Sequence, residues 1–435
     1  MIKLSTLRQL YKSIPHQVLS PLNYLPYSVF CGSIYRNKLQ ELNDVNLQII
    51  EEYQNEKLIN YVNESIAFTK FYKDYAKSKG FSKITDIEQI NDFPLVSKDH
   101  IASNLDWFVD FRYKNKSFIV STGGTTGRQT KLLMSNEAYS IEWAFVSKYL
   151  QDNGVDINSR RLCLRGADGI ESSSLLGFNH LYKEMLISPF RLTEENVLRA
   201  YKDILKYGAK WIHGYPSSVS EFAKVLSNLD LKLPSINHIL LVSEKLYPEQ
   251  EHTIRNVFNC KILTFYGMTE RVIFAPKIDE SFVPHKLYGY TENVDGELIG
   301  TGFVNKATRL IRYRTGDNAS STANENNHVE TIDEILGRWG KEYLVGANDT
   351  KITMTSLNIH SDVLENVVKY QFFQTEKGKC TLLIQPSSTF SDGEEFTVCS
   401  EFVKKTGSEL QITPKITNDI PLTSRGKHRF IVSEL

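Results

Sequence analysis

Apolar and polar positions along the chain predict an alternation of helices and strands. From Asp44 to Lys79, apolar residues recur mostly at intervals of three and four, which predicts amphipathic helices. Farther along, short apolar runs alternate with helical stretches: the runs cover residues 161–166, 211–215, 238–244 and 261–267, and the stretches cover 193–208 and 218–229. This alternation predicts an α/β fold of layered β-sheets and helices, in which ligands bind beyond the carboxyl ends of parallel strands.

The pattern becomes shorter and more mixed after Gly337. Within it, the stretch HSDVLENVVKYQFF at residues 360–373 is interpreted as helical. We therefore expect residues 1–336 to form a large N-terminal domain, with a mostly helical opening region over residues 1–115. Residues 337–435 are expected to form a small α+β domain.

The composition is that of a globular protein without a dominant charge. Hydrophobic residues make up 41% of the chain, and 51 Lys and Arg balance 51 Asp and Glu. The chain thus has no overall field that would gather nucleic acid or anionic lipid. Its five cysteines form no CxxC pair and have no metal-ligand spacing, which is typical of free thiols in the cytoplasm.

The amino terminus shows neither a signal peptide nor a transmembrane segment. The most apolar early stretch, from Val18 to Tyr35, is interrupted by Pro21, Asn23 and Pro26. We expect this stretch to pack on the domain, with peripheral contact to a membrane surface as the alternative.

The strongest local signal is a cluster of Gly and Thr between Ser121 and Lys131. Its glycines let the backbone approach a ligand closely, its hydroxyl groups add hydrogen-bond donors, and Arg128 and Lys131 supply positive charge. Such a loop suits a polyphosphate, although neither G-x-x-x-x-G-K-[ST] nor G-x-G-x-x-G fits it. Taken alone, a polar surface turn is an equal alternative.

Four further clusters follow this loop, namely YGMTE at 266–270, YRTGD at 313–317, GR at 337–338 and PLTSRGK at 421–427. In this order, they resemble the adenylate-forming superfamily of acyl- and aryl-CoA ligases, peptide-synthetase adenylation domains and luciferases. The resemblance covers roughly Phe118 to the carboxyl terminus, and the runs at 213–218 and 296–317 are most similar to the phenylacetate–coenzyme A ligase branch. The stretch RWGKEYLVG, followed by KITMTSLNIHSD, resembles the capsule-biosynthesis relatives called CapK.

The resemblance implies attack by a carboxylate on the α-phosphate of ATP, giving an acyl adenylate and pyrophosphate. Such a reaction requires groups that neutralise the charge building on the phosphate. By resemblance, Thr269 contacts the α-phosphate and Glu270 binds magnesium, a hard cation that takes oxygen ligands. The remaining implied ATP contacts are Thr122, Gly123, Gly124, Thr125, Thr126, Gly127, Lys131, Ser243, Glu244, Tyr266, Gly267, Asp317 and Arg338.

Within this set the resemblance implies distinct roles. Asp317 would accept both ribose hydroxyls, because a carboxylate offers two acceptor oxygens. Ser243 and Glu244 would line the adenine, and Tyr266 either stacks on that ring or is a core tyrosine.

Lys427 is the residue that the resemblance assigns to catalysis of adenylation, bridging the substrate carboxylate and the α-phosphate. The small domain that carries it would swing after the first step, with Lys341 as the hinge. The sequence after the Gly-Arg pair departs from the usual family form, and this departure leaves the thiol-accepting second step open.

No motif in the sequence identifies the acid or its acceptor. Arg165 follows a predicted strand and is a candidate contact for a second anionic or sugar group, with His213 and Tyr215 as further substrate contacts. The resemblance implies a small carboxylic acid and a thiol such as coenzyme A, an amine or a sugar as acceptor. The CapK likeness favours a role in assembling surface polysaccharide.

The sequence supports two other functional classes less well. A non-catalytic nucleotide-binding scaffold would keep the same cleft, although the joint presence of Thr126, Glu270, Asp317 and Lys427 favours an enzyme. A serine or cysteine hydrolase is disfavoured because the chain has no G-x-S-x-G elbow and no cysteine with a local signature.

Overall fold

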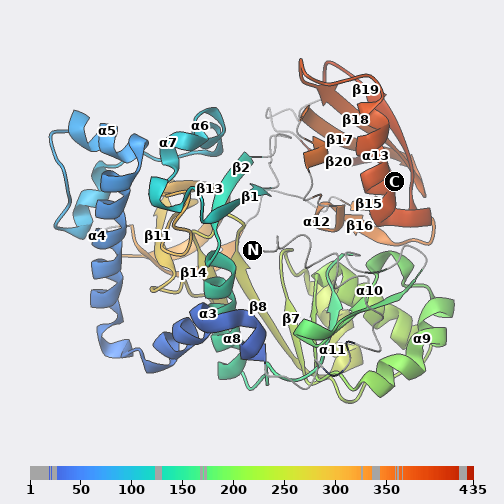
Figure 1. Cartoon of the computed structure of the whole chain (residues 1–435). Helices are drawn as coiled ribbons and strands as arrows, with labels where there is room; N and C mark the ends of the chain where they lie inside the picture. The colour runs from blue at the N-terminus through green and yellow to red at the C-terminus, as the bar shows by residue number, and fades with distance from the viewer. Residues whose placement is uncertain are drawn as a thin grey trace. The chain divides into compact units, whose positions relative to one another are not determined.

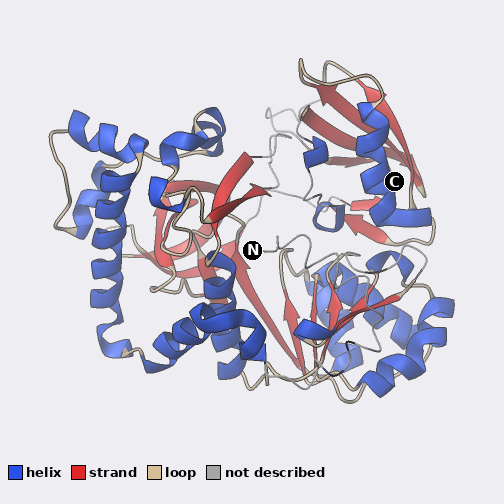
Figure 2. Cartoon of the chain, in the orientation of Figure 1, coloured by secondary structure: helices blue, strands red, loops and turns tan. Residues whose placement is uncertain are grey.

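The computed structural model describes residues 27–122, 130–166, 174–324, 327–335, 343–357, 366–420 and 429–435, together with residues 19, 21, 170, 359 and 362–364. The chain divides into two compact units that are each built from separate stretches of sequence. The first unit comprises residues 1–37 and 147–263, and the second comprises residues 38–146 and 264–435. Helices and strands occur in both (Figures 1 and 2). Three elements run from one unit into the other: α3 (Tyr27–Asp44), α8 (Ala138–Asp152) and β8 (Lys261–Gly267).

A mostly parallel sheet forms the centre of the first unit. Its strand order is β4-β5-β3-β6-β7, with β4 antiparallel to β5 and the other pairs parallel. The strands are β3 (Arg161–Leu164), β4 (Leu176–Asn179), β5 (Glu184–Ile187), β6 (Trp211–Gly214) and β7 (His238–Leu241). The accompanying helices are α9 (Glu194–Tyr207), α10 (Pro216–Asn228) and α11 (Pro248–Phe258). The predicted alternation of strands and helices is confirmed here.

Helix α9 shows how local chemistry sets the element bounds. The Thr193 hydroxyl accepts a hydrogen bond from the Asn196 amide, and acidic residues occupy the first turn. Gly208 ends the helix with a left-handed φ of 68°. Apolar side chains of α9, such as Val197, pack with Leu162 and Ile212 of the sheet.

The second unit contains an antiparallel sheet in the order β11-β12-β13-β14-β10-β9-β8. Its strands, besides β8, are β9 (Phe274–Ile278), β10 (Ser281–Phe282), β11 (Gly289–Val294), β12 (Glu297–Gly302), β13 (Tyr313–Ala323) and β14 (Val329–Ile335). A separate antiparallel pair is formed by β1 (Ser117–Thr122) and β2 (Thr130–Ser135).

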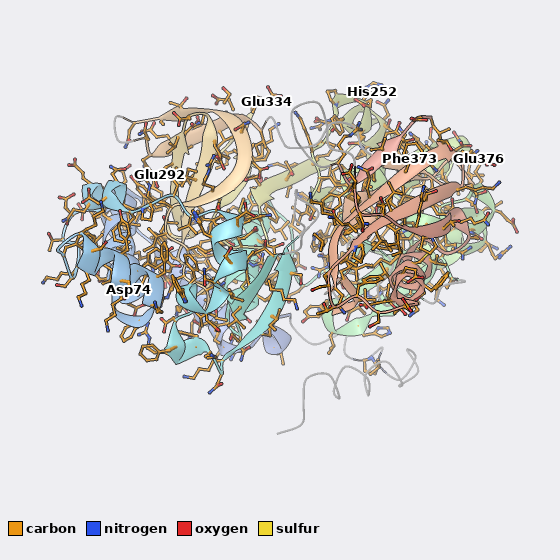
Figure 3. All side chains as sticks on the ribbon, turned by 90° about the horizontal axis from the view of Figure 1, so that it is seen from above. Asp74, His252, Glu292, Glu334, Phe373 and Glu376 are labelled. Atoms are coloured by element: carbon orange, nitrogen blue, oxygen red, sulfur yellow. The ribbon has the colours of Figure 1, made fainter. Side chains whose placement is uncertain are left out.

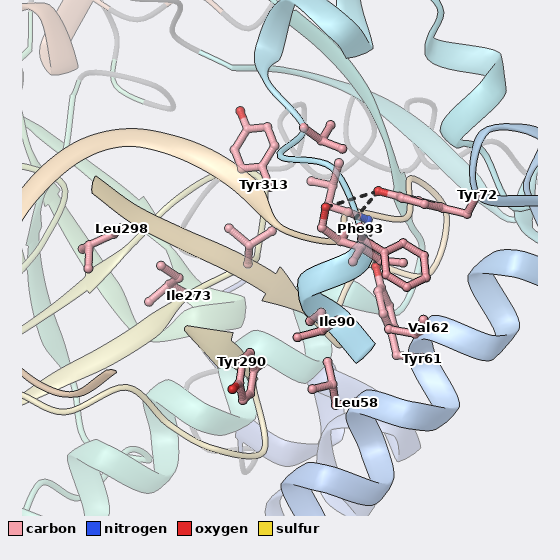
Figure 4. Close-up of a cluster of buried hydrophobic side chains, with 14 of the residues drawn as sticks. Leu58, Tyr61, Val62, Tyr72, Ile90, Phe93, Ile273, Tyr290, Leu298 and Tyr313 are labelled. Atoms are coloured by element: carbon pink, nitrogen blue, oxygen red, sulfur yellow. Dashed lines mark hydrogen bonds between the residues drawn. The ribbon is translucent and has the colours of Figure 1, made fainter. Parts of the chain in front are cut away.

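The amino-terminal part of this unit is helical. Its helices are α4 (Ile50–Phe68), α5 (Lys70–Ser78), α6 (Lys98–Ser103) and α7 (Leu105–Phe108). Two buried tyrosine hydroxyls of α4 and α5 accept backbone hydrogen bonds: Tyr61 from the Leu310 amide at 3.0 Å and Tyr72 from the Ile311 amide at 2.8 Å. Figure 4 shows these tyrosines in the apolar cluster that joins the helices to the antiparallel sheet. The predicted amphipathic helices are thus confirmed and their apolar faces are buried.

The carboxyl-terminal residues form a four-stranded sheet in the order β19-β18-β17-β20 and a pair β15-β16. The elements are β15 (Tyr343–Val345), β16 (Lys351–Thr353), α12 (Met354–Leu357), β17 (Val367–Glu376), β18 (Lys379–Pro386), α13 (Glu394–Thr406), β19 (Gln411–Ile416) and β20 (Ile431–Ser433). Strand β17 is antiparallel to β18 and parallel to β20.

The helix predicted over residues 360–373 is wrong. Apart from one short 3-10 turn at Asp362–Leu364, the described part of this stretch is strand β17, which carries Phe373 and Glu376 (Figure 3). Valine, tyrosine and phenylalanine favour strands when neighbours pair on both sides, and β18 and β20 provide those neighbours.

Among the described helices, none combines the length and the apolar character needed to cross a membrane.

Candidate functional site

Glu270 lies in the turn that follows strand β8 of the second unit. Its side chain is buried, and its Oε1 accepts a hydrogen bond of 2.9 Å from the Tyr313 hydroxyl. The Lys98 ammonium, on the first residue of α6, lies 3.4 Å from the same oxygen. The sheet and the helical region therefore each supply one partner for the carboxylate that the sequence assigns to magnesium.

The turn is held from the other side by Arg271. This residue has a left-handed φ of 62°, which is uncommon for a residue with a side chain. Its guanidinium forms an ion pair with Glu142 of α8, and the Tyr288 hydroxyl donates to Glu142 Oε1 at 3.3 Å. Burial raises the pKa of the Glu142 carboxyl, and the charge of Arg271 opposes that rise. This pairing fixes the backbone next to Thr269 and Glu270.

Asp317 is held by a tyrosine from a strand that is not its neighbour in the sheet. The Tyr266 hydroxyl, on β8, donates to Asp317 Oδ2 at 2.8 Å, although β13 carries Asp317. The Asp317 amide donates to the Thr315 hydroxyl at 3.0 Å, and the Gly316 amide donates to Glu297 Oε1 at 2.7 Å. The structure therefore brings the predicted adenine and ribose residues of this unit together.

This contact bears on the two interpretations of Tyr266. The ring is partly buried and packs against the apolar cluster of the second unit, while its hydroxyl binds Asp317. The next residue, Gly267, leaves little room for a side chain, because a Cβ there would lie 3.3 Å from the ring of Phe265. Tyr266 is thus at least a support for Asp317, and stacking on adenine stays a prediction.

The loop predicted to bind phosphate joins the ends of β1 and β2. Thr122 and Thr130 are the last paired residues of the two strands, and Lys131 pairs with Ser121. The residues Gly123, Gly124, Thr125, Thr126 and Gly127, together with Arg338, Lys341 and Lys427, lie outside the described part of the chain. Their roles stay predictions.

In the first unit, Ser243 and Glu244 follow strand β7. Ser243 adopts a left-handed φ of 68°, and Glu244 Oε2 accepts a hydrogen bond of 3.1 Å from the Ser217 amide in the first turn of α10. A carboxylate at a helix amino terminus is stabilised by the unpaired amides there. Glu244 therefore has a structural partner whether or not adenine binds beside it.

The three predicted substrate residues lie on adjacent parallel strands of this unit. Arg165 directly follows β3, His213 lies within β6, and Tyr215 directly follows β6. Gly214, between the last two, has no room for a side chain because a Cβ would approach Val219 Cγ2 to 2.5 Å. Burial, reinforced by Arg165 and Arg161, holds the pKa of His213 well below its ordinary value.

Sequence reasoning missed the partners of these residues. Lys98 and Tyr313 both contact Glu270. Glu184, on the neighbouring strand β5, faces Arg165. Tyr313 begins the YRTGD cluster, so this cluster is a signal from which it could be predicted. Lys98 and Glu184 belong to none of the clusters.

Glu270 offers one carboxylate to the magnesium ion that the family resemblance implies. The structure already places the positive charge of Lys98 at this carboxylate. Among the described residues, no group of three or more His, Cys, Asp or Glu side chains gathers to hold a metal. Magnesium is commonly held by one or two carboxylates together with waters and substrate phosphates, so a single protein carboxylate is compatible with it.

Comparison with known proteins gives a consistent result. Residues 344–434 match the family model of the CapK C-terminal domain. Protein CapK of Staphylococcus aureus is 24% identical over 425 residues, which cover 92% of this chain and 91% of that protein.

Solved structures share the fold over nearly the whole chain. A 2-hydroxyisobutyryl-CoA ligase, in complex with 2-HIB-AMP and CoA, has a TM-score of 0.56 at 14% identity and covers 88% of this chain and 90% of its own. An open conformation of that ligase has a TM-score of 0.52, also at 14% identity, and covers 87% and 90%. The predicted α/β fold is confirmed, and so is the resemblance to CapK: the chain is similar to CapK over most of its length and shares the fold of this CoA ligase.

Proposed function

We propose that this protein is an AMP-forming ligase that activates a carboxylic acid with ATP and transfers the acyl group to an acceptor. The observation that carries this proposal is the pair of tyrosine-held carboxylates, Glu270 with Tyr313 and Asp317 with Tyr266. The 2-hydroxyisobutyryl-CoA ligase with the same fold was solved with an acyl-AMP and CoA, which supports the reaction class.

In the first step, a carboxylate oxygen of the acid attacks the α-phosphorus of ATP. The bond between the α-phosphorus and the bridging oxygen breaks, and pyrophosphate leaves with the bond electrons. Thr269 contacts the α-phosphate, Asp317 accepts the ribose hydroxyls, and Ser243 and Glu244 line the adenine. When bound at Glu270, magnesium supplies positive charge against that of the phosphates.

The roles of the residues outside the described part complete the proposal. The loop that contains Thr125, Thr126 and Gly127 binds the β- and γ-phosphates, and Arg338 lies near the ribose. Lys427 neutralises the charge that builds as the carboxylate meets the α-phosphate. We place the boundary of the small domain near Gly337, with Lys341 as its hinge.

For the second step we propose an acceptor used in surface polysaccharide assembly, an amine or hydroxyl on a sugar, with coenzyme A as the other candidate. The match of residues 344–434 to the CapK C-terminal domain supports this choice. We further propose that the protein acts in the cytoplasm, where ATP is available, and that any membrane contact is peripheral.

Exchange of labelled pyrophosphate into ATP tests the first step. We expect exchange that depends on one class of acid within a panel of aryl acids, amino acids, hydroxy acids and dicarboxylic acids, and we expect Lys427→Ala to abolish it. Calorimetry in parallel measures ATP binding. Tight ATP binding without exchange or AMP release over the whole panel would instead identify a nucleotide-binding scaffold.

A further inference from the structure

The parallel sheet of the first unit has two unlike faces. Side chains alternate along a strand, so Leu162 and Leu164 of β3 point to the apolar side packed by helices. Arg161 and Cys163 occupy the opposite side. In register with them lie further polar residues of the neighbouring strands: Glu184 pairs with Arg161, and His213 pairs with Cys163. We call Arg161, Cys163, Arg165, Glu184 and His213 the polar stripe.

One carboxylate of the polar stripe serves two guanidinium groups. Arg161 Nε and Nη2 donate to Glu184 Oε1 at 3.0 and 2.7 Å, which makes a close, charge-assisted pair. Arg165 Nη2 lies 3.6 Å from the same oxygen, longer than a hydrogen bond. Glu184 therefore compensates Arg161 directly and Arg165 only in part.

The other members of the polar stripe add no negative charge. Burial raises the pKa of the Cys163 thiol, which accepts a hydrogen bond of 3.4 Å from Arg165 Nε and stays protonated near neutral pH. His213 stays neutral because burial and both arginines lower its pKa. The described residues of the polar stripe thus carry two positive charges and one negative charge, so one positive charge is left uncompensated.

That positive charge lies at the accessible end of the polar stripe. The side chains of Arg161 and Glu184 are 4% and 5% exposed, whereas that of Arg165 is 37% exposed. Arg165 directly follows the carboxyl end of β3, the edge at which parallel sheets bind ligands. Tyr215, which follows β6, lies close enough to interact with it electrostatically.

We propose that the acid activated by this protein carries a second anionic group, a carboxylate or a phosphate, and that Arg165 binds this second group. The inference rests on the proposed adenylation function and names its substrate class. A planar guanidinium donates two parallel hydrogen bonds to a carboxylate or phosphate, and Glu184 fixes its position from behind. An acid whose only carboxylate reacts with ATP would leave Arg165, among the described residues, with just the partial compensation from Glu184.

Binding measurements on matched acids test this proposal without requiring turnover. Calorimetry in the presence of a non-hydrolysable ATP analogue compares succinate, glutarate and adipate with butyrate, pentanoate and hexanoate. A second arm compares 3-phosphoglycerate with glycerate and so separates a phosphate from a carboxylate. The proteins are the wild type, Arg165→Met, Arg165→Lys, and the control Arg160→Met, which removes an arginine that instead packs on Tyr207.

We expect at least one doubly anionic acid to bind the wild type about tenfold or more tightly than its matched partner. Arg165→Met should remove that preference, Arg165→Lys should keep part of it, and Arg160→Met should keep all of it. Equal binding of both classes by the wild type, or an unchanged preference in Arg165→Met with an unchanged melting temperature, overturns the proposal. Pyrophosphate exchange on the same proteins reports the adenylation function separately: exchange confined to singly charged acids contradicts this inference alone, and an Arg165-dependent preference without exchange contradicts the function alone.

Discussion

Glu270 and Asp317 of the second unit and Glu184 of the first are held in opposite ways. In the second unit, Glu270 and Asp317 each accept a hydrogen bond from a tyrosine hydroxyl, a neutral group that fixes position without cancelling charge. In the first unit, Glu184 faces two arginines, and the balance there is positive. Under the proposed function, Glu270 and Asp317 would meet a cation and ribose hydroxyls, whereas Arg165 would meet an anionic acid.

Lys98 qualifies this contrast. Its ammonium lies 3.4 Å from Glu270 Oε1, and an ammonium on a flexible stem lacks the planar, two-pronged geometry of a guanidinium. The Lys98 ammonium stabilises the buried Glu270 carboxylate, and its flexible side chain can move away when another cation binds there. The two arginines that face Glu184 both come from β3 or the residue directly after it, and Arg161 binds Glu184 through two hydrogen bonds.

The largest effect is expected from a substitution at Glu184. Glu184→Gln leaves Arg161 buried without a counter-charge, and we expect the free energy of unfolding to fall by about 3–5 kcal/mol. Urea denaturation measures this loss. Glu195→Gln, in an exposed ion pair with Arg199 on α9, is the matched control and should change stability little. Similar stability of both variants would show that the two-arginine array is not structural.

The second test addresses Glu270. Glu270→Gln keeps the shape and the hydrogen bond from Tyr313 but removes the charge, and we expect pyrophosphate exchange to fall about a hundredfold or more. Raising the magnesium concentration should recover part of the rate. Glu280→Gln, whose side chain is almost fully exposed, is the control. Full exchange by Glu270→Gln would remove this carboxylate from the magnesium site.

A pH test follows from His213. Its pKa is lowered in the folded state, so below its ordinary value of about 6.5 the unfolded chain binds a proton that the folded chain does not. Stability is therefore complete above about pH 6.5 and falls as the pH drops below it, by up to about 1.4 kcal/mol per pH unit. Melting temperatures at about pH 7.5 and 5.5 should differ less in His213→Gln than in the wild type. An equal shift in both would place the acid sensitivity elsewhere.

The smallest effects are expected at the two tyrosines. Tyr266→Phe and Tyr313→Phe each remove one hydrogen bond to a carboxylate, a change of about 1 kcal/mol or about fivefold in an affinity. We expect Tyr266→Phe to raise the KM for ATP, through Asp317, and Tyr313→Phe to raise the magnesium concentration needed for half-maximal exchange. If both variants changed the same parameter equally, the two carboxylates would not have separate roles.

Part of the fold could be predicted from the sequence because local chemistry determines it. Helix α9 lies between Thr193 and Gly208, residue types that begin and end helices, and the structure confirms both limits. Strand β17 was misassigned because its apolar residues also fit a helical spacing. Its pairing with the adjacent strand β18 and with β20, which lies far away in the sequence, makes it a strand.

In the candidate site, too, local sequence predicts some residues, while others depend on contacts between distant segments. Short clusters located Glu270 and Asp317, but no local pattern states that Tyr266 reaches Asp317 across the sheet. The contact between Lys98 and Glu270 likewise depends on how α6 packs near the end of β8. Glu184 lies on a strand with no cluster at all, and only the register of β5 with β3 reveals its partner Arg161.

The hydroxyls of Tyr61 and Tyr72 hold the backbone at Leu310 and Ile311, immediately before the strand that starts at Tyr313. Helices α4 and α5, which contain none of the sequence clusters, thereby anchor the start of the strand that carries Asp317. Substitutions that remove these hydroxyls are therefore expected to loosen the position of Asp317, even though every residue of the sequence clusters is unchanged.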